Sequence, residues 1–283
     1  MTPDELSAGN PRIRHAAKLR MKKFRRATGC ILIEGARLVA DALDAGADVR
    51  ELFATRDFLD SPGGKSVLGS DAAPGVTPVT AAAANKLSET RTPQGVFAVV
   101  RVSLPELADV PLGGTTRSPV RTGEHLPAAA VLLADGIADP GNLGTMIRSA
   151  AALGADCVVA SGRSADVLSP KCVRATMGAI FRVPVVAGVR LADAMDGLKS
   201  RGLRIVAAVA RDGRPPWEVD WRGPTALLIG SEADGLPKEA MDTADERITL
   251  PMSGGMESLN AAAGAAALLA EMARQRSEER YGR

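Results

Sequence analysis

The chain is organised around ten residues, Asp139-Pro140-Gly141-Asn142-Leu143-Gly144-Thr145-Met146-Ile147-Arg148. The apolar run at 130–134 ahead of them is typical of a buried strand, which Pro140 and Gly141 end. The residues that follow keep helical spacing, so Arg148 is expected within the first two turns of a helix. These residues therefore join a strand to a helix and bring an amide, Asn142, and a guanidinium, Arg148, to one site.

The rest of the C-terminal half repeats this alternation. Apolar runs occur at 131–134, 156–160, 183–186, 204–210 and 225–229, and segments with helical spacing separate them. Strands that alternate with helices predict a parallel, doubly wound sheet. Only 3% of the residues are aromatic, so aliphatic side chains must fill the core, as is usual in such a sheet. An alanine-rich helix is expected from Ser258 to about Arg276.

The N-terminal part predicts a smaller α/β domain. We expect strands at 31–33, 51–54 and 96–100, helices at 35–45 and 81–87, and a loop at 60–78. A segment rich in proline and glycine follows, which is the composition of a linker. The expected organisation is a first domain at 1–102, a linker at 103–127 and a second domain at 128–283.

Composition excludes several classes of protein. With 283 residues, of which 46% are hydrophobic and 24% charged, the chain is globular. Three cysteines without disulfide or metal spacing favour a reducing compartment, and the start does not resemble a signal peptide, so we expect a cytoplasmic protein. No apolar run approaches the roughly 18 residues of a membrane span. Two histidines, far apart in sequence, offer little material for a metal site.

The net charge is only +2, but basic residues gather near the N-terminus. Eight of them lie between 12 and 26 with no acidic residue among them: Arg12, Arg14, Lys18, Arg20, Lys22, Lys23, Arg25 and Arg26. A segment of this kind attracts phosphate backbones and predicts an RNA-binding surface. The alternative is a solvated helix face or a frayed tail.

Two later segments follow predicted strands, as the first one does. They are 229–235, which contains Gly230-Ser231-Glu232, and 250–260, which ends in Ser258-Leu259-Asn260. Ligands of open parallel sheets bind beyond the carboxyl ends of the strands, so all three segments are candidates to line one pocket. The chain contains no Gly-x-Gly, so it lacks the dinucleotide fingerprint, and it has no phosphate-binding P-loop.

Each segment also has a plain structural interpretation. Asn142 could cap a helix and Arg148 could be a surface cation, while Glu232 could be a solvated carboxylate. Ser258 is a plausible helix N-cap, with Asn260 in the first turn. The spacing Gly141-x-x-Gly144 also occurs in an RNA-clamping loop, but two spaced glycines are a weak signal.

Taken together, the three motifs resemble the SpoU (TrmH-like) class of SPOUT RNA methyltransferases. The resemblance rests on Asn142-x-Gly144-x-x-x-Arg148, on Gly230-Ser231-Glu232-x-x-Gly235, and on Pro251-Met252 followed by Ser258-Leu259-Asn260. It covers about 128–276, and the first domain is similar, more loosely, to a ribosomal-protein-like module through Glu34-Gly35 and Thr92-Pro93-Gln94-Gly95. One departure is Asn260-Ala261-Ala262-Ala263, where the family often has Asn-Val-Ser-Val.

The resemblance implies a trefoil knot in the C-terminal domain, a homodimer formed through that domain, and transfer of a methyl group from S-adenosylmethionine to a ribose 2′-hydroxyl. It places the methyl donor at main-chain groups of Val209, Ala210, Gly230, Leu250 and Leu259. The implied catalytic residues are Arg148, Asn142, Glu232, Ser258 and Asn260. No metal is implied.

The role of Arg148 stays open between two mechanisms. The family proposal makes this arginine the base, but a guanidinium has a pKa above about 12 and is almost never neutral. The alternative is that Arg148 binds the target phosphate and lowers the pKa of the hydroxyl by its charge. In either case Asn142 and Asn260 would orient Arg148 or the ribose, Glu232 would hold the arginine or a hydroxyl, and Ser258 would donate near the reacting oxygen.

Ribosomal RNA of the large subunit is the favoured target, because the first domain and the basic segment indicate a sizeable folded RNA. Transfer RNA is the first alternative. A non-catalytic RNA-binding protein of the same fold is the second, and a flavodoxin-like binder of another small molecule is the third. The residues do not identify the modified nucleotide. Routine ribosome maturation and self-protection against an antibiotic would use the same residues.

Overall fold

A computed structural model describes residues 5–68, 75–113, 128–254, 256 and 258–281. By its contacts the chain divides into two compact units. The first consists of the chain up to Ser103 together with Leu168–Phe181, and the second of Leu104–Val167 and Arg182–Arg283. The sequence pattern does not indicate that a segment from the middle of the C-terminal half packs with the first unit.

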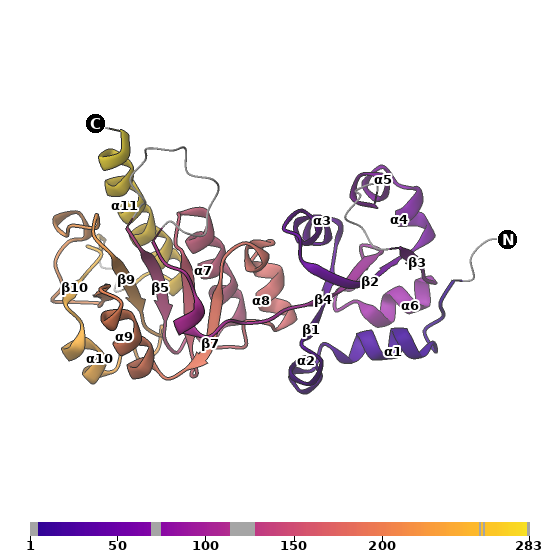
Figure 1. Cartoon of the computed structure of the whole chain (residues 1–283), viewed down its shortest axis with the longest axis horizontal. Helices are drawn as coiled ribbons and strands as arrows, with labels where there is room; N and C mark the ends of the chain where they lie inside the picture. The colour runs from indigo at the N-terminus through magenta and orange to yellow at the C-terminus, as the bar shows by residue number, and fades with distance from the viewer. Residues whose placement is uncertain (1–4, 69–74, 114–127, 255, 257, 282–283) are drawn as a thin grey trace. The chain divides into compact units, whose positions relative to one another are not determined.

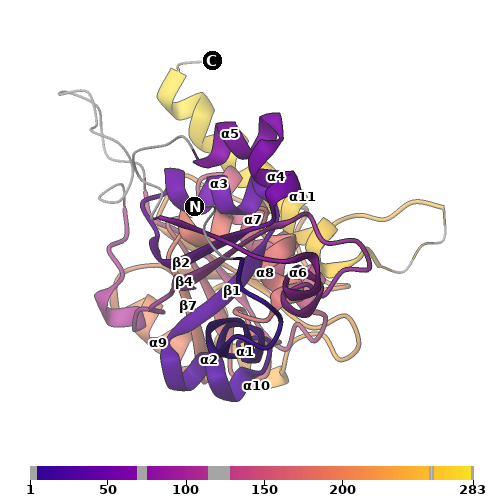
Figure 2. The ribbon, with the colours of Figure 1, turned by 90° about the vertical axis from the view of Figure 1, so that its right-hand side faces the viewer.

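The first unit is built on a sheet in the order β1-β4-β2-β3. Central β4 pairs antiparallel with β1 and β2, and β2 pairs parallel with β3. Helices lie on both faces of this sheet, with α1 and α6 on one and α3 on the other (Figures 1 and 2). The element bounds are β1 Cys30–Glu34, β2 Asp48–Ala54, β3 Val76–Pro78, β4 Val96–Arg101, α1 Pro11–Lys18, α2 Lys22–Thr28, α3 Ala36–Asp44, α4 Arg56–Asp60, α5 Pro62–Leu68 and α6 Ala81–Leu87, with α8 Pro170–Ala175 and the 3-10 turn η2 Ala179–Phe181 from the later segment.

The expected strands and helices of the first unit are present, but the loop expected at 60–78 is wrong. Pro62 starts α5, because proline fits the first position of a helix, where no backbone N–H is needed. The same region ends in β3, which pairs with β2 through Leu52 and Val76. Glycine and proline favour a break in regular structure, but here a proline starts a helix.

The second unit is built on a parallel sheet in the order β10-β8-β9-β5-β6-β7, which confirms the predicted α/β fold. A sixth strand, β10, joins the five expected ones at the edge beside β8. The bounds are β5 Ala130–Ala134, β6 Cys157–Ser161, β7 Val185–Val189, β8 Arg204–Ala208, β9 Thr225–Ile229, β10 Glu246–Ile248, α7 Pro140–Ala152, α9 Leu191–Ser200, α10 Lys238–Thr243 and α11 Ala261–Tyr281, with the 3-10 turns η1 Leu107–Asp109 and η3 Pro216–Glu218.

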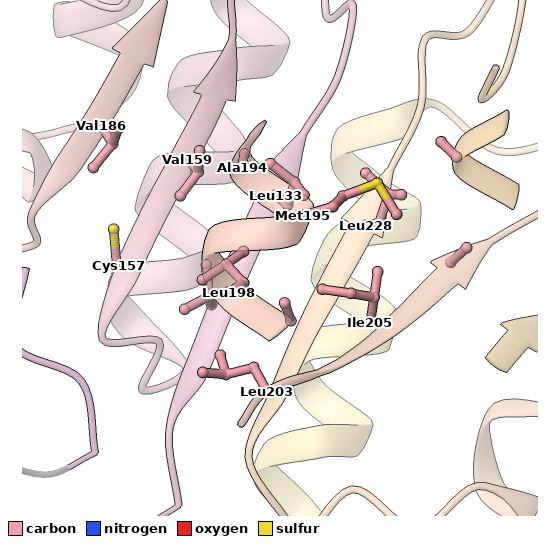
Figure 3. Close-up of a cluster of buried hydrophobic side chains, with 14 of the residues drawn as sticks. Leu133, Cys157, Val159, Val186, Ala194, Met195, Leu198, Leu203, Ile205 and Leu228 are labelled. Atoms are coloured by element: carbon pink, nitrogen blue, oxygen red, sulfur yellow. The ribbon is translucent and has the colours of Figure 1, made fainter. Parts of the chain in front are cut away.

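Alternate residues of each strand face the two helical layers. Figure 3 shows one of them, where Met195 and Leu198 of α9 pack on Leu133, Ile205 and Leu228 of the sheet. The opposite face is covered by α7 and α11, which also pack on each other. This arrangement buries both faces of the sheet, so its polar chemistry lies at the strand ends.

The chain reverses direction across this sheet between β5 and β9. From β5 it proceeds through β6 to β7, and it then crosses to β8 on the other side. Such a reversal opens a crevice beyond the carboxyl ends of the two central strands. The trefoil knot implied by the resemblance stays a prediction. Within the described residues, no helix combines the length and apolarity that crossing a membrane requires.

Candidate active site

A cavity of ≈ 390 Å³ lies beyond the carboxyl ends of β8, β9 and β10. Its wall includes all five residues expected to hold a methyl donor: Val209, Ala210, Gly230, Leu250 and Leu259. Val209 and Ala210 directly follow β8, and Gly230 directly follows β9. Gly264, Ala265 and Leu268 of α11 close the cavity from the opposite side. Three segments far apart in the sequence therefore meet around one space.

Close backbone packing explains the glycine at 230. A Cβ atom at Gly230 would lie 2.5 Å from the carbonyl carbon of Gly235, which is closer than real contacts allow. The loop between them is closed by two main-chain hydrogen bonds, from Ser231 N to Gly235 O (3.2 Å) and from Gly235 N to Ser231 O (3.0 Å). The tight loop holds Glu232 at its outer end, beside the cavity.

Three of the expected catalytic side chains form one hydrogen-bonded cluster. Glu232 Oε1 accepts from Asn142 Nδ2 (3.0 Å), from Asn260 Nδ2 (2.7 Å) and from the backbone N–H of Ala261 (2.9 Å). Asn260 Nδ2 also donates to Asn142 Oδ1 at 3.1 Å. Residues separated by as many as 118 positions thus present two amides and a carboxylate as a unit, which we call the amide–carboxylate cluster.

Helix caps fix two members of this cluster. Asp139 caps α7 by accepting from the N–H of Asn142 (2.9 Å), so the Asn142 side chain starts from a defined backbone. Asn260 Oδ1 accepts from the N–H groups of Ala262 (3.1 Å) and Ala263 (3.2 Å) at the start of α11. The helix expected from Ser258 therefore begins three residues later, and Asn260 takes the capping role first considered for Ser258.

The remaining two expected catalytic residues are placed differently. Ser258 is exposed and lines the larger cavity. Arg148 is exposed on α7, where, within the described part of the chain, it lines neither cavity and its side chain makes no hydrogen bond to another residue. Its guanidinium is therefore available to a ligand from outside the protein rather than held against the amide–carboxylate cluster.

A second cavity, of ≈ 340 Å³, shares five lining residues with the first: Ser231, Glu232, Ala233, Asp234 and Ala261. Its wall contains Arg163, whose Nε donates to Asp135 Oδ1 at 3.5 Å and whose Nη2 forms an ion pair with Asp135 Oδ2. The Asp135 side chain is fully buried, while that of Arg163 is 58% exposed. The hydrogen bond from Arg163 to Asp135 raises the pKa of Arg163, so the guanidinium stays charged.

The sequence analysis did not single out Arg163 and Asp135, although their positions at the ends of apolar runs could have indicated them. Asp135 directly follows β5 and Arg163 lies two residues after β6, so both stand at the carboxyl ends of buried strands. A charged residue at that point is exceptional in a run of apolar side chains, and it marks the edge where ligands bind.

The basic segment of the first unit is divided by its contacts. Arg25 is buried and donates to the carbonyl oxygens of Leu19 (3.0 Å) and Arg20 (2.5 Å), so the expectation that it binds RNA is wrong. Two others also have protein partners, since Arg12 Nε donates to Glu51 at 2.7 Å and Arg20 donates to the Lys86 carbonyl. The exposed remainder comprises Arg14, Lys18, Lys22, Lys23 and Arg26, which we call the basic patch.

Comparison with known proteins shows the family to which the chain belongs. Residues 129–270 match the model of the SpoU rRNA methylase family, and residues 10–98 match that of the MRM3-like substrate binding domain. The chain belongs to the SpoU rRNA methylase family, with a substrate-binding domain ahead of the methylase domain. The resemblance inferred from the three motifs is confirmed.

Two of the curated relatives are named as methyltransferases of 23S ribosomal RNA. The chain is 33% identical over 265 residues to the 23S rRNA (guanosine(2553)-2′-O)-methyltransferase RlmP of Bacillus subtilis. The matched region covers 93% of this chain and 96% of that protein. It is 40% identical over 151 residues to the 23S rRNA (uridine(2479)-2′-O)-methyltransferase of Streptomyces viridochromogenes, covering 51% of this chain and 52% of that protein.

Two solved structures match nearly the whole chain. A crystal structure of an RNA 2′-O ribose methyltransferase superimposes with a TM-score of 0.79 at 31% identity, covering 97% of this chain and 100% of that one. The SpoU methyltransferase AviRb from Streptomyces viridochromogenes, in complex with S-adenosylmethionine, gives 0.80 at 30% identity and covers 95% and 98%.

The larger cavity fits S-adenosylmethionine in size and chemistry. Its volume of ≈ 390 Å³ falls within the roughly 300–1,000 Å³ of small-molecule sites, which are mostly apolar with a few polar groups. Aliphatic residues such as Val209, Leu250 and Leu268 could cover the adenine, while Ser231, Glu232 and Ser258 supply polar groups. Among the described residues, no group of three or more metal-binding side chains is gathered.

Proposed function

We propose that this protein methylates a ribose 2′-hydroxyl of large-subunit ribosomal RNA, using S-adenosylmethionine. The observation that carries the proposal is the amide–carboxylate cluster at the mouth of the larger cavity. A relative that acts on 23S ribosomal RNA and matches nearly the full chain supports the choice of RNA. Transfer RNA is the second candidate, because one structure that matches 56% of the chain, at a TM-score of 0.50, concerns 2′-hydroxyl methylation of tRNA.

Positioning carries much of the proposed catalysis. When bound, S-adenosylmethionine supplies a methyl group on a sulfonium, which is already activated for transfer. The chain must then hold the ribose hydroxyl in line with that methyl and keep water away. Val209, Ala210 and Leu250, which line the larger cavity, would fix the donor, and Ser258 in the same wall would donate a hydrogen bond to the reacting oxygen.

The two asparagine amides orient the ribose, and the guanidinium of Arg148 stabilises charge. Asn142 and Asn260 already donate to Glu232, so each is fixed before substrate arrives and orients the ribose without reorganisation. Exposed Arg148 meets the phosphate beside the target ribose with two parallel hydrogen bonds and stabilises the developing negative charge on the oxygen. In this proposal Arg148 acts through its charge and its hydrogen bonds and is not the base.

The basic patch docks the RNA. Lys22 and Lys23 occupy the first turn of α2, where positive charge is unfavourable for the helix, so the stability of α2 does not explain them. Binding to an RNA phosphate backbone explains these lysines, because each Lys or Arg that contacts the backbone releases counterions and so favours binding. We further propose that the active protein is a knotted homodimer, as the family resemblance implies, and that it acts in the cytoplasm, as the cysteine pattern favours.

The decisive experiment is transfer of labelled methyl from S-adenosylmethionine to unmodified ribosomal RNA and, separately, to unmodified transfer RNA. We expect label in the large-subunit RNA, at one nucleotide, as a 2′-O-methyl ribose. Label in transfer RNA alone would establish the second candidate instead. No transfer to either, with S-adenosylmethionine still bound, would refute both.

A further inference from the structure

The smaller cavity has a composition that points to an uncharged ligand. Beside Arg163, its wall carries the carboxylates of Asp139, Glu232 and Asp234. Three carboxylates against one guanidinium repel a phosphate group, whose charge would lie close to all of them. Carboxylates do accept hydrogen bonds from N–H and O–H groups, which the sugar and base of a nucleotide offer. A volume of ≈ 340 Å³ is within the range of small-molecule sites.

Arg163 is held in place by its ion pair. Nε and Nη2 both face Asp135, which is fully buried, so this edge of the guanidinium is fixed against the protein. Within the described residues Nη1 has no partner, and the side chain remains 58% exposed. The loop around Asp135 is itself tied down, because Ile137 N donates to Ser164 Oγ (3.2 Å), which donates to Ala134 O (3.2 Å). A fixed donor can select a ligand by the pattern of its acceptors.

Asp234 supplies the complementary acceptor. It lines the same cavity and interacts electrostatically with Arg163. Its own N–H donates to Ser231 Oγ at 3.0 Å, which fixes its backbone in the tight loop after β9. A donor, Arg163, and an acceptor, Asp234, therefore line the same cavity.

We infer that the smaller cavity holds the base of the target nucleotide, and that Arg163 and Asp234 select guanine or uracil over adenine or cytosine. This inference rests on the proposed function. Guanine and uracil carry a carbonyl oxygen next to a ring N–H, which complements a donor and an acceptor side by side. Adenine and cytosine present an amino group and an unprotonated ring nitrogen there, so donor meets donor and acceptor meets acceptor.

The position of the cavity suits this role. It shares Glu232 and Ala261 with the larger cavity, and Asn142 of the amide–carboxylate cluster lines it. A base in the smaller cavity would thus place its own ribose at the cluster, next to the proposed methyl donor. Proteins read RNA bases in this way in single-stranded loops, where bases are splayed out and their edges are hydrogen-bonded.

The test compares substrates that differ in one base. Unmodified 23S ribosomal RNA transcribed in vitro is methylated by the full-length protein, and the 2′-O-methyl nucleoside is identified after digestion. The target guanine is then replaced by adenine, or the target uracil by cytosine. We expect kcat/KM of the wild type to fall roughly 10- to 100-fold on this change, the discrimination typical of one well-formed pair of base contacts.

Variants assign the discrimination to Arg163. In Arg163→Ala the ratio between the two substrates should fall to about one, whereas Arg190→Ala, a surface arginine paired only with Asp193 among the described residues, should keep the wild-type ratio. Arg163→Gln retains a donor and should be intermediate, which also covers the case that Arg163→Ala does not fold. S-adenosylmethionine binding should be unchanged in all three.

Two results would overturn the inference while the methyltransferase function stands: a target nucleotide in the unaltered RNA that is an adenosine or a cytidine, or a folded Arg163→Ala protein with the wild-type base preference. Absence of any RNA methylation by the wild type would instead remove the proposed function on which the inference rests. A loss of activity in Arg163→Ala equal for both substrates would also contradict base selection, since it is what a structural role predicts.

Discussion

At the scale of single residues, Arg148 differs from the other expected catalytic groups because it is exposed and outside both cavities. Arg148→Ala should therefore leave S-adenosylmethionine affinity within about twofold, while kcat falls about 100- to 1,000-fold, the usual effect of removing one group that stabilises transition-state charge. Calorimetry measures the first quantity and labelled-methyl transfer the second. Unchanged turnover would remove Arg148 from the mechanism.

Arg148→Lys separates the charge of this residue from its hydrogen-bonding geometry. Lysine keeps the charge but loses the planar fork that binds a phosphate through two hydrogen bonds. Substantial activity in this variant would favour a simple electrostatic role. Activity as low as in Arg148→Ala would show that the fork itself is required.

Asn260 carries a structural and a chemical role that substitution can separate. Asn260→Ser keeps a good helix cap for α11 but loses the amide that donates to Glu232 and Asn142. We expect its free energy of unfolding to stay within about 0.5 kcal/mol of wild type while kcat falls. Asn260→Ala should lose activity and also about 1 kcal/mol of stability. Chemical denaturation together with methyl transfer distinguishes them, and a fully active serine variant would contradict the chemical role.

The residues of the amide–carboxylate cluster could be predicted from the sequence, but the ion pair at the smaller cavity could not. Asn142, Glu232 and Asn260 lie near expected strand or helix ends, and their convergence follows from parallel strands sharing one edge. Arg163 and Asp135 were not predicted as site residues, because each is a single charged residue in an ordinary sequence context. Only the fold brings them together as an ion pair. Arg25 appeared as one more basic residue, since sequence does not show that its guanidinium is buried against backbone carbonyls.

At the scale of elements, α2 allows the docking proposal to be tested. Replacing Lys22, Lys23 and Arg26 with alanine should weaken RNA binding and reduce the dependence of log affinity on log salt by roughly 0.7–0.9 for each side chain that neutralises a phosphate. Exposed Arg50, which pairs with Asp48 at the surface, offers a control in Arg50→Ala. Filter binding of ribosomal RNA at several salt concentrations measures both; an unchanged salt slope in the triple variant would exclude the basic patch as the docking surface.

Strand β6 gives a prediction about pH. Burial raises the pKa of Cys157 from 9.0 to about 12, because the thiolate would lie in the apolar core. An unfolded chain loses this proton above its ordinary pKa while the folded chain keeps it, so stability falls as pH rises between these two values. The slope from this thiol is about 1.4 kcal/mol per pH unit.

The contribution of Cys157 is isolated by comparison with Cys157→Ala. The variant should be less stable at about pH 8, because it leaves unfilled volume in the core, yet lose less stability than wild type on moving to about pH 10.5. Urea denaturation at the two pH values provides the measurement. Parallel losses in both proteins would show that the thiol does not titrate as its burial requires.

Periodicity predicted most elements, and the failures have physical causes. Strand β10 is short and begins with Glu246 and Arg247, so it lacks the apolar run that marks the other strands. Helix α5 starts at Pro62 in a segment rich in turn residues. Serine and asparagine are both good helix caps, so the sequence alone cannot decide whether α11 starts after Ser258 or after Asn260. The hydrogen bonds of Asn260 show that it is the cap.

At the scale of the whole molecule, the sequence predicted an α/β protein with a parallel-sheet methylase domain behind a smaller domain, and the family comparisons agree. The discontinuous first unit was not predictable, because α8 lies between two strands of the other sheet in sequence. The homodimer stays a prediction. Sedimentation equilibrium of the full chain should give twice the mass of 29.3 kDa.

The central claim is that the cavity beyond β8, β9 and β10 binds the methyl donor. Gly264 of α11 lines this cavity, and a Cβ atom there would meet Leu250 at an ordinary distance of 3.9 Å. Gly264→Ala should therefore fold well, with a stability gain of up to about 1 kcal/mol from helix propensity. Gly264→Phe should fold equally well but fill the cavity with its ring.

Calorimetric titration of S-adenosylmethionine into these proteins tests that claim directly. We predict binding to the wild type and to Gly264→Ala, and a loss of at least about 100-fold in affinity in Gly264→Phe, because the ring and the donor cannot occupy one volume. Binding of wild-type strength to a folded Gly264→Phe protein would contradict the account.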